Sequence, residues 1–79
     1  MRWPRFTKAQ RAFLLELDRA TYNALRYGGR QRQTVYALVH HGMVKTFGAF
    51  NGVELTNRGR DYLRFGMRRA TAQGEERGG

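Results

Sequence analysis

The amino-acid sequence predicts a single small α+β domain, and three observations support this fold class. Apolar residues recur at helical spacing through the first half of the chain. The pattern then changes to the two-residue alternation of strands around an Asn-Gly pair, and a further helical segment follows. With 79 residues, the chain has room for one modest hydrophobic core.

We expect the first helix to begin after Thr7. Thr7 and Gln10 have the spacing of a capping box, in which each side chain bonds the backbone amide of the other residue. The pattern weakens around Asp18. An inward-facing apolar stripe lies between these points, formed by Ala9, Phe13, Leu14 and Leu17, with Leu15 widening it.

Two more helices are expected before the strands, over residues 21–27 and from about Arg30 or Gln31 to His41, which gives a three-helix core. Glycines 28 and 29 would end the first of these two helices, because glycine readily adopts positive φ. The other helix has an apolar face at i, i+3 and i+4 and ends before a further glycine; this face consists of Val35, Leu38 and Val39.

A β-hairpin is expected next, with strands over residues 43–47 and 53–56. Asn51-Gly52 favours a two-residue type I′ turn, which would pair Phe50 with Val53 and Gly48 with Leu55, unless Gly48 marks a bulge. A last helix, capped by Thr56, should run from Asn57 to about Ala70, and the residues expected to pack inward are Tyr62, Leu63 and Met67.

The domain is expected over residues 7–70, with an N-terminal arm over residues 1–6. Residues 71–79 hold no large apolar side chain, which predicts a disordered tail.

The chain holds 15 Lys plus Arg against 6 Asp plus Glu, a formal net charge of +9. Such an excess attracts polyanions, either nucleic acid or an anionic membrane surface. Most of the cations are arginine, which forms two-pronged contacts with phosphate and guanine, although a GC-rich genome would produce the same bias.

Several classes of protein are excluded by composition. The chain has no cysteine and therefore no disulfide framework or thiolate zinc site, and its longest apolar run, residues 35–39, is far too short to span a bilayer. The first residues have no apolar signal region, so we expect a cytoplasmic protein associated with the nucleoid. No serine occurs, and no phosphate-binding glycine loop or carboxylate pair is visible, so we expect neither an enzyme nor a cofactor or metal site.

Three segments resemble winged helix-turn-helix regulators of bacteria and phages. Residues 34–39, TVYALV, resemble a recognition helix, and residues 41–44, HGMV, resemble the GLV stretch that leaves it. Residues 55–63, LTNRGRDYL, are similar to the LTxxGRxxL stretch after the wing of MarR-like and PadR-like proteins. The resemblance implies a three-helix core with a β-hairpin wing and a C-terminal helix. The chain departs from it at residues 28–29, where many relatives carry a longer helix and turn, and it lacks their long dimerisation helices.

The resemblance implies that this chain binds double-stranded DNA, with its recognition helix in the major groove and its wing on the backbone or in the minor groove. We expect a small transcriptional regulator in which Arg and Gln near the start of that helix select bases. The candidate DNA-binding residues are Arg30, Gln31, Arg32, Gln33, Thr34, Tyr36, Ala37, His40, Lys45, Asn51, Arg58 and Arg60. Tyr36 has a second interpretation, as a partly buried core residue.

Two other functions stay open. The first is a protein-interaction module, for example a phage factor that docks on host machinery, with Phe50 or Trp3 as anchors; for Trp3 we favour a different role, as a plug at the edge of the core. The second is an architectural protein that binds nucleic acid, including RNA, by shape alone. A homodimer is also possible, and the candidate self-association surfaces are the first and the last helix. The first helix, with Phe13, Leu14 and Leu17, is favoured, because the last helix is heavily basic.

Overall fold

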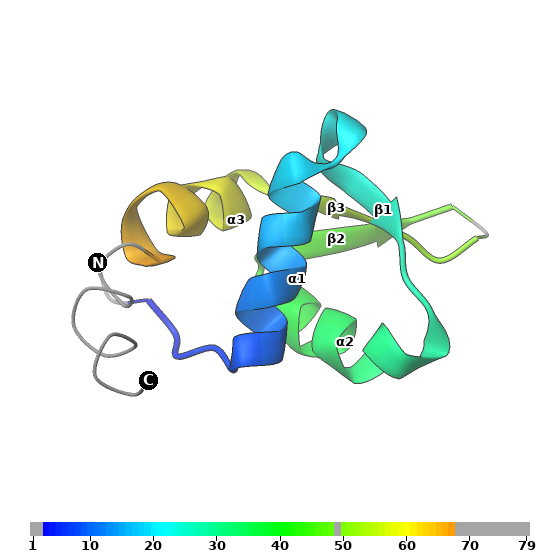
Figure 1. The fold of residues 1–79 in the computed structure, drawn as a ribbon, viewed down its shortest axis with the longest axis horizontal. Helices are drawn as coiled ribbons and strands as arrows, with labels where there is room; N and C mark the ends of the chain where they lie inside the picture. The colour runs from blue at the N-terminus through cyan, green and yellow to red at the C-terminus, as the bar shows by residue number, and fades with distance from the viewer. Residues whose placement is uncertain (1–2, 49, 68–79) are drawn as a thin grey trace.

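The structure is a computed structural model that describes residues 3–48 and 50–67. Over these residues it confirms an α+β fold, with three α-helices and one antiparallel sheet (Figure 1). The segments η1 and η2 are single 3-10 turns, and η3 is a π-helical turn that continues α3. In chain order the elements are α1 (Lys8–Arg19), η1 (Thr21–Asn23), β1 (Ala24–Arg26), η2 (Gly29–Gln31), α2 (Arg32–His40), β2 (Val44–Phe47), β3 (Gly52–Leu55), α3 (Asn57–Asp61) and η3 (Tyr62–Gly66).

Helix α1 begins where the sequence predicts. The Thr7 hydroxyl accepts a hydrogen bond from the Gln10 amide at 3.1 Å, and the Gln10 side chain accepts one from the Thr7 amide at 2.9 Å, so both halves of the capping box form. The buried stripe is narrower than predicted, because Ala9 and Leu15 are exposed. The helix packs its remaining apolar residues into the core: Phe13, Leu14 and Leu17.

The predicted helix over residues 21–27 is wrong, and with it the three-helix core. After α1, Tyr22 and Asn23 both adopt the left-handed region, with φ of 58° and 53°, which turns the chain back. The Asn23 side chain supports this reversal by donating hydrogen bonds to two backbone oxygens of the last turn of α1, those of Leu17 at 3.2 Å and Asp18 at 3.1 Å.

The reversal lays the next three residues beside the hairpin as strand β1. Their partners are Ala24↔Glu54, Leu25↔Val53 and Arg26↔Gly52, and the sheet order is β1-β3-β2. The physical reason is tertiary: an isolated two-stranded hairpin is marginal in water, and a third strand lets the sheet cover the core. That gain exceeds the small helix propensity of residues 21–27.

The hairpin forms, but the predicted register is wrong. Phe47 pairs with Gly52 and Val44 with Leu55, so neither Phe50–Val53 nor Gly48–Leu55 is a pair. Gly48 and Asn51 both have positive φ, 71° and 56°, and bound a longer loop. Asn51 thus adopts the left-handed conformation that the turn signal predicts, while the glycine after it belongs to β3.

Helix α2 starts slightly later than expected, because Gly29–Gln31 form a 3-10 turn before it. Val35 and Leu38 are fully buried, whereas Val39 is largely exposed. Helices α1 and α2 contact the sheet, and Figure 1 shows α1 between α3 at one end of the molecule and the hairpin loop at the other.

The start of α3 agrees with the prediction. The Thr56 hydroxyl accepts a hydrogen bond from the Gly59 amide at 3.0 Å and donates one to the Gly42 carbonyl, which joins α3 to the turn after α2. Tyr62 and Met67 are buried and Leu63 packs against the core. The expected end of this helix near residue 70 and the expected tail over residues 71–79 lie outside the described residues.

Part of the expected N-terminal arm belongs to the core. Phe6 is buried and meets the Tyr62 ring edge-on, with ring centroids 4.8 Å apart. Trp3 is half-buried and meets the same ring at 5.6 Å, which confirms its role as a plug. Within residues 3–48 and 50–67, no helix is long and apolar enough to cross a membrane.

Candidate nucleic-acid interface

The exposed face of α2 brings several predicted site residues together. Arg32, Tyr36 and His40 are spaced four residues apart and therefore share one face of the helix, with Gln33 beside them. All four are exposed, and Tyr36 has 56% of its surface accessible, so it does not belong to the core. This face offers a guanidinium, a phenol and an imidazole along one line, with an amide beside them.

The other predicted residues near α2 contribute less surface. Arg30 is exposed on the turn before the helix. The Gln31 side chain accepts a hydrogen bond from the Gly28 amide at 3.0 Å, so its oxygen stabilises the turn. Thr34 and Ala37 are half-buried at the sides of the exposed face.

The hairpin loop is attached to the segment that leads into α2. The Tyr27 amide donates a hydrogen bond to the Asn51 carbonyl at 3.0 Å, and the Arg26 guanidinium lies 5.3 Å from the centre of the Phe50 ring. These contacts hold the loop at the end of the molecule where η2 and the start of α2 lie (Figure 1). Lys45, by contrast, lies 3.3 Å from the Glu54 carboxylate, whose negative charge offsets that of the lysine.

The two predicted arginines of α3 differ in their contacts. Arg58 donates from Nε to the His41 carbonyl at 3.1 Å, and its guanidinium lies 5.3 Å from the Trp3 ring, so it helps to hold the fold. Arg60 is exposed. Helix α3, which carries both arginines, lies at the opposite end of the molecule from the hairpin loop (Figure 1).

The charges are unevenly distributed along the chain. No acidic residue occurs between Asp18 and Glu54, a stretch that forms β1, η2, α2 and β2. The cations of these four elements are Arg26, Arg30, Arg32 and Lys45. The exposed face of α2 therefore has no acidic residue of its own element, or of the elements on either side, to repel a phosphate.

The favoured self-association surface is wrong. Phe13, Leu14 and Leu17 are buried in the core of the chain itself, so they are not available to pack against a second copy.

Among the described residues, no group of three His, Asp or Glu side chains is placed to hold a metal ion. His41 meets the Phe6 ring edge-on at 5.4 Å, and only His40 of the pair is exposed.

Sequence reasoning missed Arg26 as a surface residue of interest. Its position beside Phe50 depends on β1, and a helix was expected over that segment. The available signal was Tyr22-Asn23, because asparagine tolerates the left-handed region and caps helices.

Comparison of the chain with protein-family models, curated proteins and solved structures yields no match.

Proposed function

We propose that this protein binds double-stranded DNA through the exposed face of α2, in the manner of a small winged helix-turn-helix regulator. The observation that carries the proposal is the exposure of Arg30, Arg32 and Gln33 together at the start of a helix in an acid-free part of the chain. Arginine pairs with guanine, and glutamine with adenine, on the edges exposed in the major groove.

The order of elements supports the winged-helix interpretation in part. A helix, a short strand, a second helix and a hairpin follow one another, and the three strands form one antiparallel sheet. The single turn η2 stands where a full helix would precede the recognition helix, so we propose a reduced form of that fold. The hairpin, fixed by the Tyr27–Asn51 bond, would act as the wing.

Direct titration tests the proposal. The protein is mixed with a pool of random duplexes at near-physiological salt, and bound duplexes are selected and sequenced. We expect an enriched motif and an affinity that falls steeply with salt, because neutralised phosphates release counterions. A flat salt response, or no enrichment, would contradict a sequence-preferring DNA-binding protein.

Arg32→Ala is the sharpest variant for this test. We expect it to weaken binding to the selected duplex by about 1–3 kcal/mol and to relax the preference at one base position. Arg19→Ala is the matched control, because it removes the same charge from an exposed site at the end of α1. Equal losses in the two variants would show that charge alone drives binding, as in an architectural protein.

One observation favours a protein-interaction module as a second candidate. Phe50 has 71% of its surface exposed, and an exposed aromatic residue beside an arginine is a common interface anchor. Trp3 is a weaker anchor than the sequence suggested, because it packs on Tyr62. In this case Phe50→Ala would abolish function in the cell, and Arg32→Ala would spare it.

A further inference from the structure

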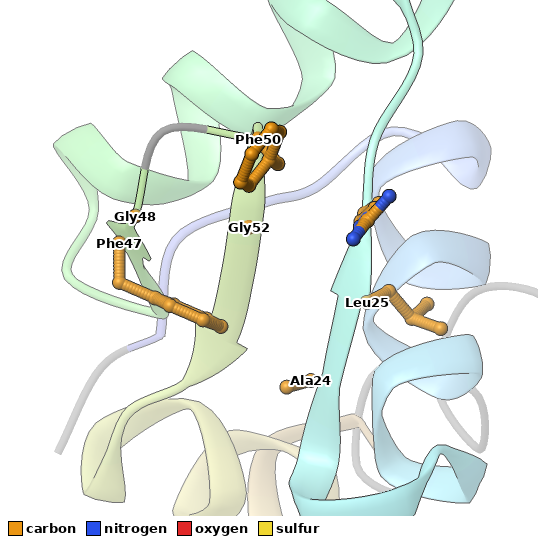
Figure 2. Close-up of a pocket in the computed structure, with 7 residues that line it drawn as sticks. Ala24, Leu25, Phe47, Gly48, Phe50 and Gly52 are labelled. Atoms are coloured by element: carbon orange, nitrogen blue, oxygen red, sulfur yellow. The ribbon is translucent and has the colours of Figure 1, made fainter.

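The sheet has an outer face on which Arg26, Lys45 and Phe47 are exposed, and its composition differs from that of the core face. Partners in an antiparallel sheet point to the same side, so Arg26, Gly52 and Phe47 form one row across the three strands. The next row along the strands on this side consists of Ala24, Glu54 and Lys45. Leu25 points the other way, toward α1 (Figure 2), and its partner Val53 is fully buried in the core.

Glycine at position 52 shapes this face. A Cβ atom there would lie 2.9 Å from two atoms of the Phe47 ring, so the ring occupies the space above Gly52. Figure 2 shows Phe47 reaching from β2 across β3. The Phe47 side chain remains 48% exposed, which leaves much of the ring open to solvent. An aromatic surface therefore lies in the middle of the sheet.

A shallow hollow of about 350 Å³ lies between this ring and the loop. Phe47, Phe50, Gly52, Ala24 and Arg26 contribute to its walls. Its size is at the lower end of the range for small-molecule pockets. Two exposed phenylalanines with a guanidinium beside them form a site that matches a flat, aromatic and anionic group.

The charges around the hollow favour an anion over a second copy of this protein. Glu54 is the one acidic residue among the three strands, and Lys45 lies 3.3 Å from its carboxylate. The Arg26 guanidinium lies 5.3 Å from the centre of the Phe50 ring, in the row of the sheet next to the one that holds Glu54. A second chain of net charge +9 would be repelled from it.

We propose that the outer face of the sheet binds single-stranded nucleic acid, with an unpaired base stacked on Phe47 and Phe50 and a neighbouring phosphate at Arg26. Every base has a π-face, so aromatic side chains stack on single strands regardless of sequence. In a duplex these faces are already stacked on neighbouring bases and are not accessible. This site is separate from the exposed face of α2 and does not depend on duplex binding there.

The test measures binding of the 79-residue protein to fluorescein-labelled oligo-dT and oligo-U and to a blunt duplex. We expect Phe50→Ala to weaken binding of the single strands about tenfold, the size of one lost stacking contact, and to leave duplex affinity within about twofold. Arg32→Ala should show the reverse pattern. A difference between oligo-dT and oligo-U would assign the site to DNA or to RNA.

Phe65→Ala is the matched control. Phe65 is 60% exposed and has the Arg64 guanidinium 6.0 Å from its ring centre, but it lies on η3 and lines no part of the hollow. Equal losses from Phe50→Ala and Phe65→Ala would overturn the proposal. So would full oligo-dT affinity in Phe50→Ala protein.

A second measurement locates the site without any mutation. In amide NMR spectra, oligo-dT should shift the signals of Gly52 and Phe47, and polyphosphate, which has no bases, should shift them much less. Equal shifts with polyphosphate would overturn the proposal, because charge alone would then account for binding. Shifts confined to α2 would also overturn it, whether or not α2 binds duplexes.

Discussion

Two arginine–aromatic pairs, one at each end of the molecule, have the same distance between guanidinium and ring but different surroundings. Arg58 lies 5.3 Å from the Trp3 ring, and Arg26 lies 5.3 Å from the Phe50 ring. The first pair is part of the packing: Arg58 also donates to the His41 carbonyl, and the half-buried Trp3 packs on Tyr62. At the second pair, Phe50 is mostly exposed beside a hollow.

The comparison separates an aromatic residue that stabilises the fold from one that is available to a ligand. A cation over a ring is a modest interaction at an exposed site, so it does not by itself explain why an apolar ring stays in water. At the α3 end, burial of the ring surface supplies the explanation. At the hairpin end, the proposed nucleic-acid contact supplies it.

We expect the largest loss of stability at the α3 end from Gly59→Ala. A Cβ atom at this position would collide with the backbone oxygen of Met43, and backbone cannot move aside cheaply. We expect a loss of about 3 kcal/mol or more in the free energy of unfolding, measured by urea denaturation. Gly28→Ala is the control, since no atom of the described residues other than its chain neighbours lies within 4 Å of a Cβ there. Equal stability of the two variants would contradict close packing of α3 against Met43.

Trp3→Ala and Phe50→Ala test the comparison directly. Removing a half-buried tryptophan should cost about 2–3 kcal/mol, somewhat below the value for a fully buried one. Removing the exposed Phe50 should change stability by about 0.5 kcal/mol or less. Thermal and urea unfolding of the two proteins measure both values. A large loss in Phe50→Ala would show that this ring belongs to the fold as well.

Thr56→Val should produce a smaller loss at the α3 end. The substitution keeps the shape of the side chain but removes the cap of α3 and the bond to the Gly42 carbonyl. We expect a cost of about 1–2 kcal/mol in the free energy of unfolding. Thr46→Val, on an exposed strand residue, is the control, and an unchanged stability of Thr56→Val would mean that water replaces both bonds.

The smallest effect concerns alkaline pH. Burial raises the pKa of Tyr62 above its ordinary value of 10.0, and the nearby Arg11 charge lowers it by a smaller amount. Above that pH the unfolded chain ionises Tyr62 before the folded chain does. The unfolded state then binds fewer protons, and the free energy of unfolding falls as pH rises through the folded pKa. Denaturation curves on either side of pH 10 should show this fall in the native protein and a weaker one in Tyr62→Phe.

Local chemistry made some features predictable from sequence. The caps at Thr7 and Thr56 act within one helical turn, so their spacing was enough to place the starts of α1 and α3. The face of α2 was predictable for the same reason, because the helical period separates Val35 and Leu38 from Arg32 and Tyr36. The exposure of the candidate base-reading residues was therefore a consequence of local pattern.

The conformation of residues 21–27 and the hairpin register were decided by tertiary structure. The segment is compatible with either a helix or a strand, and what selects the strand is the open edge of β3, which lies far away in sequence. The register depends on how β3 fits between two neighbours, with Gly52 beneath the Phe47 ring. The sequence alone determined the charge, the starts of α1 and α3 and the exposed α2 face, because these depend on near neighbours. The position of Arg26 beside Phe50 required long-range strand pairing, which no local pattern encodes.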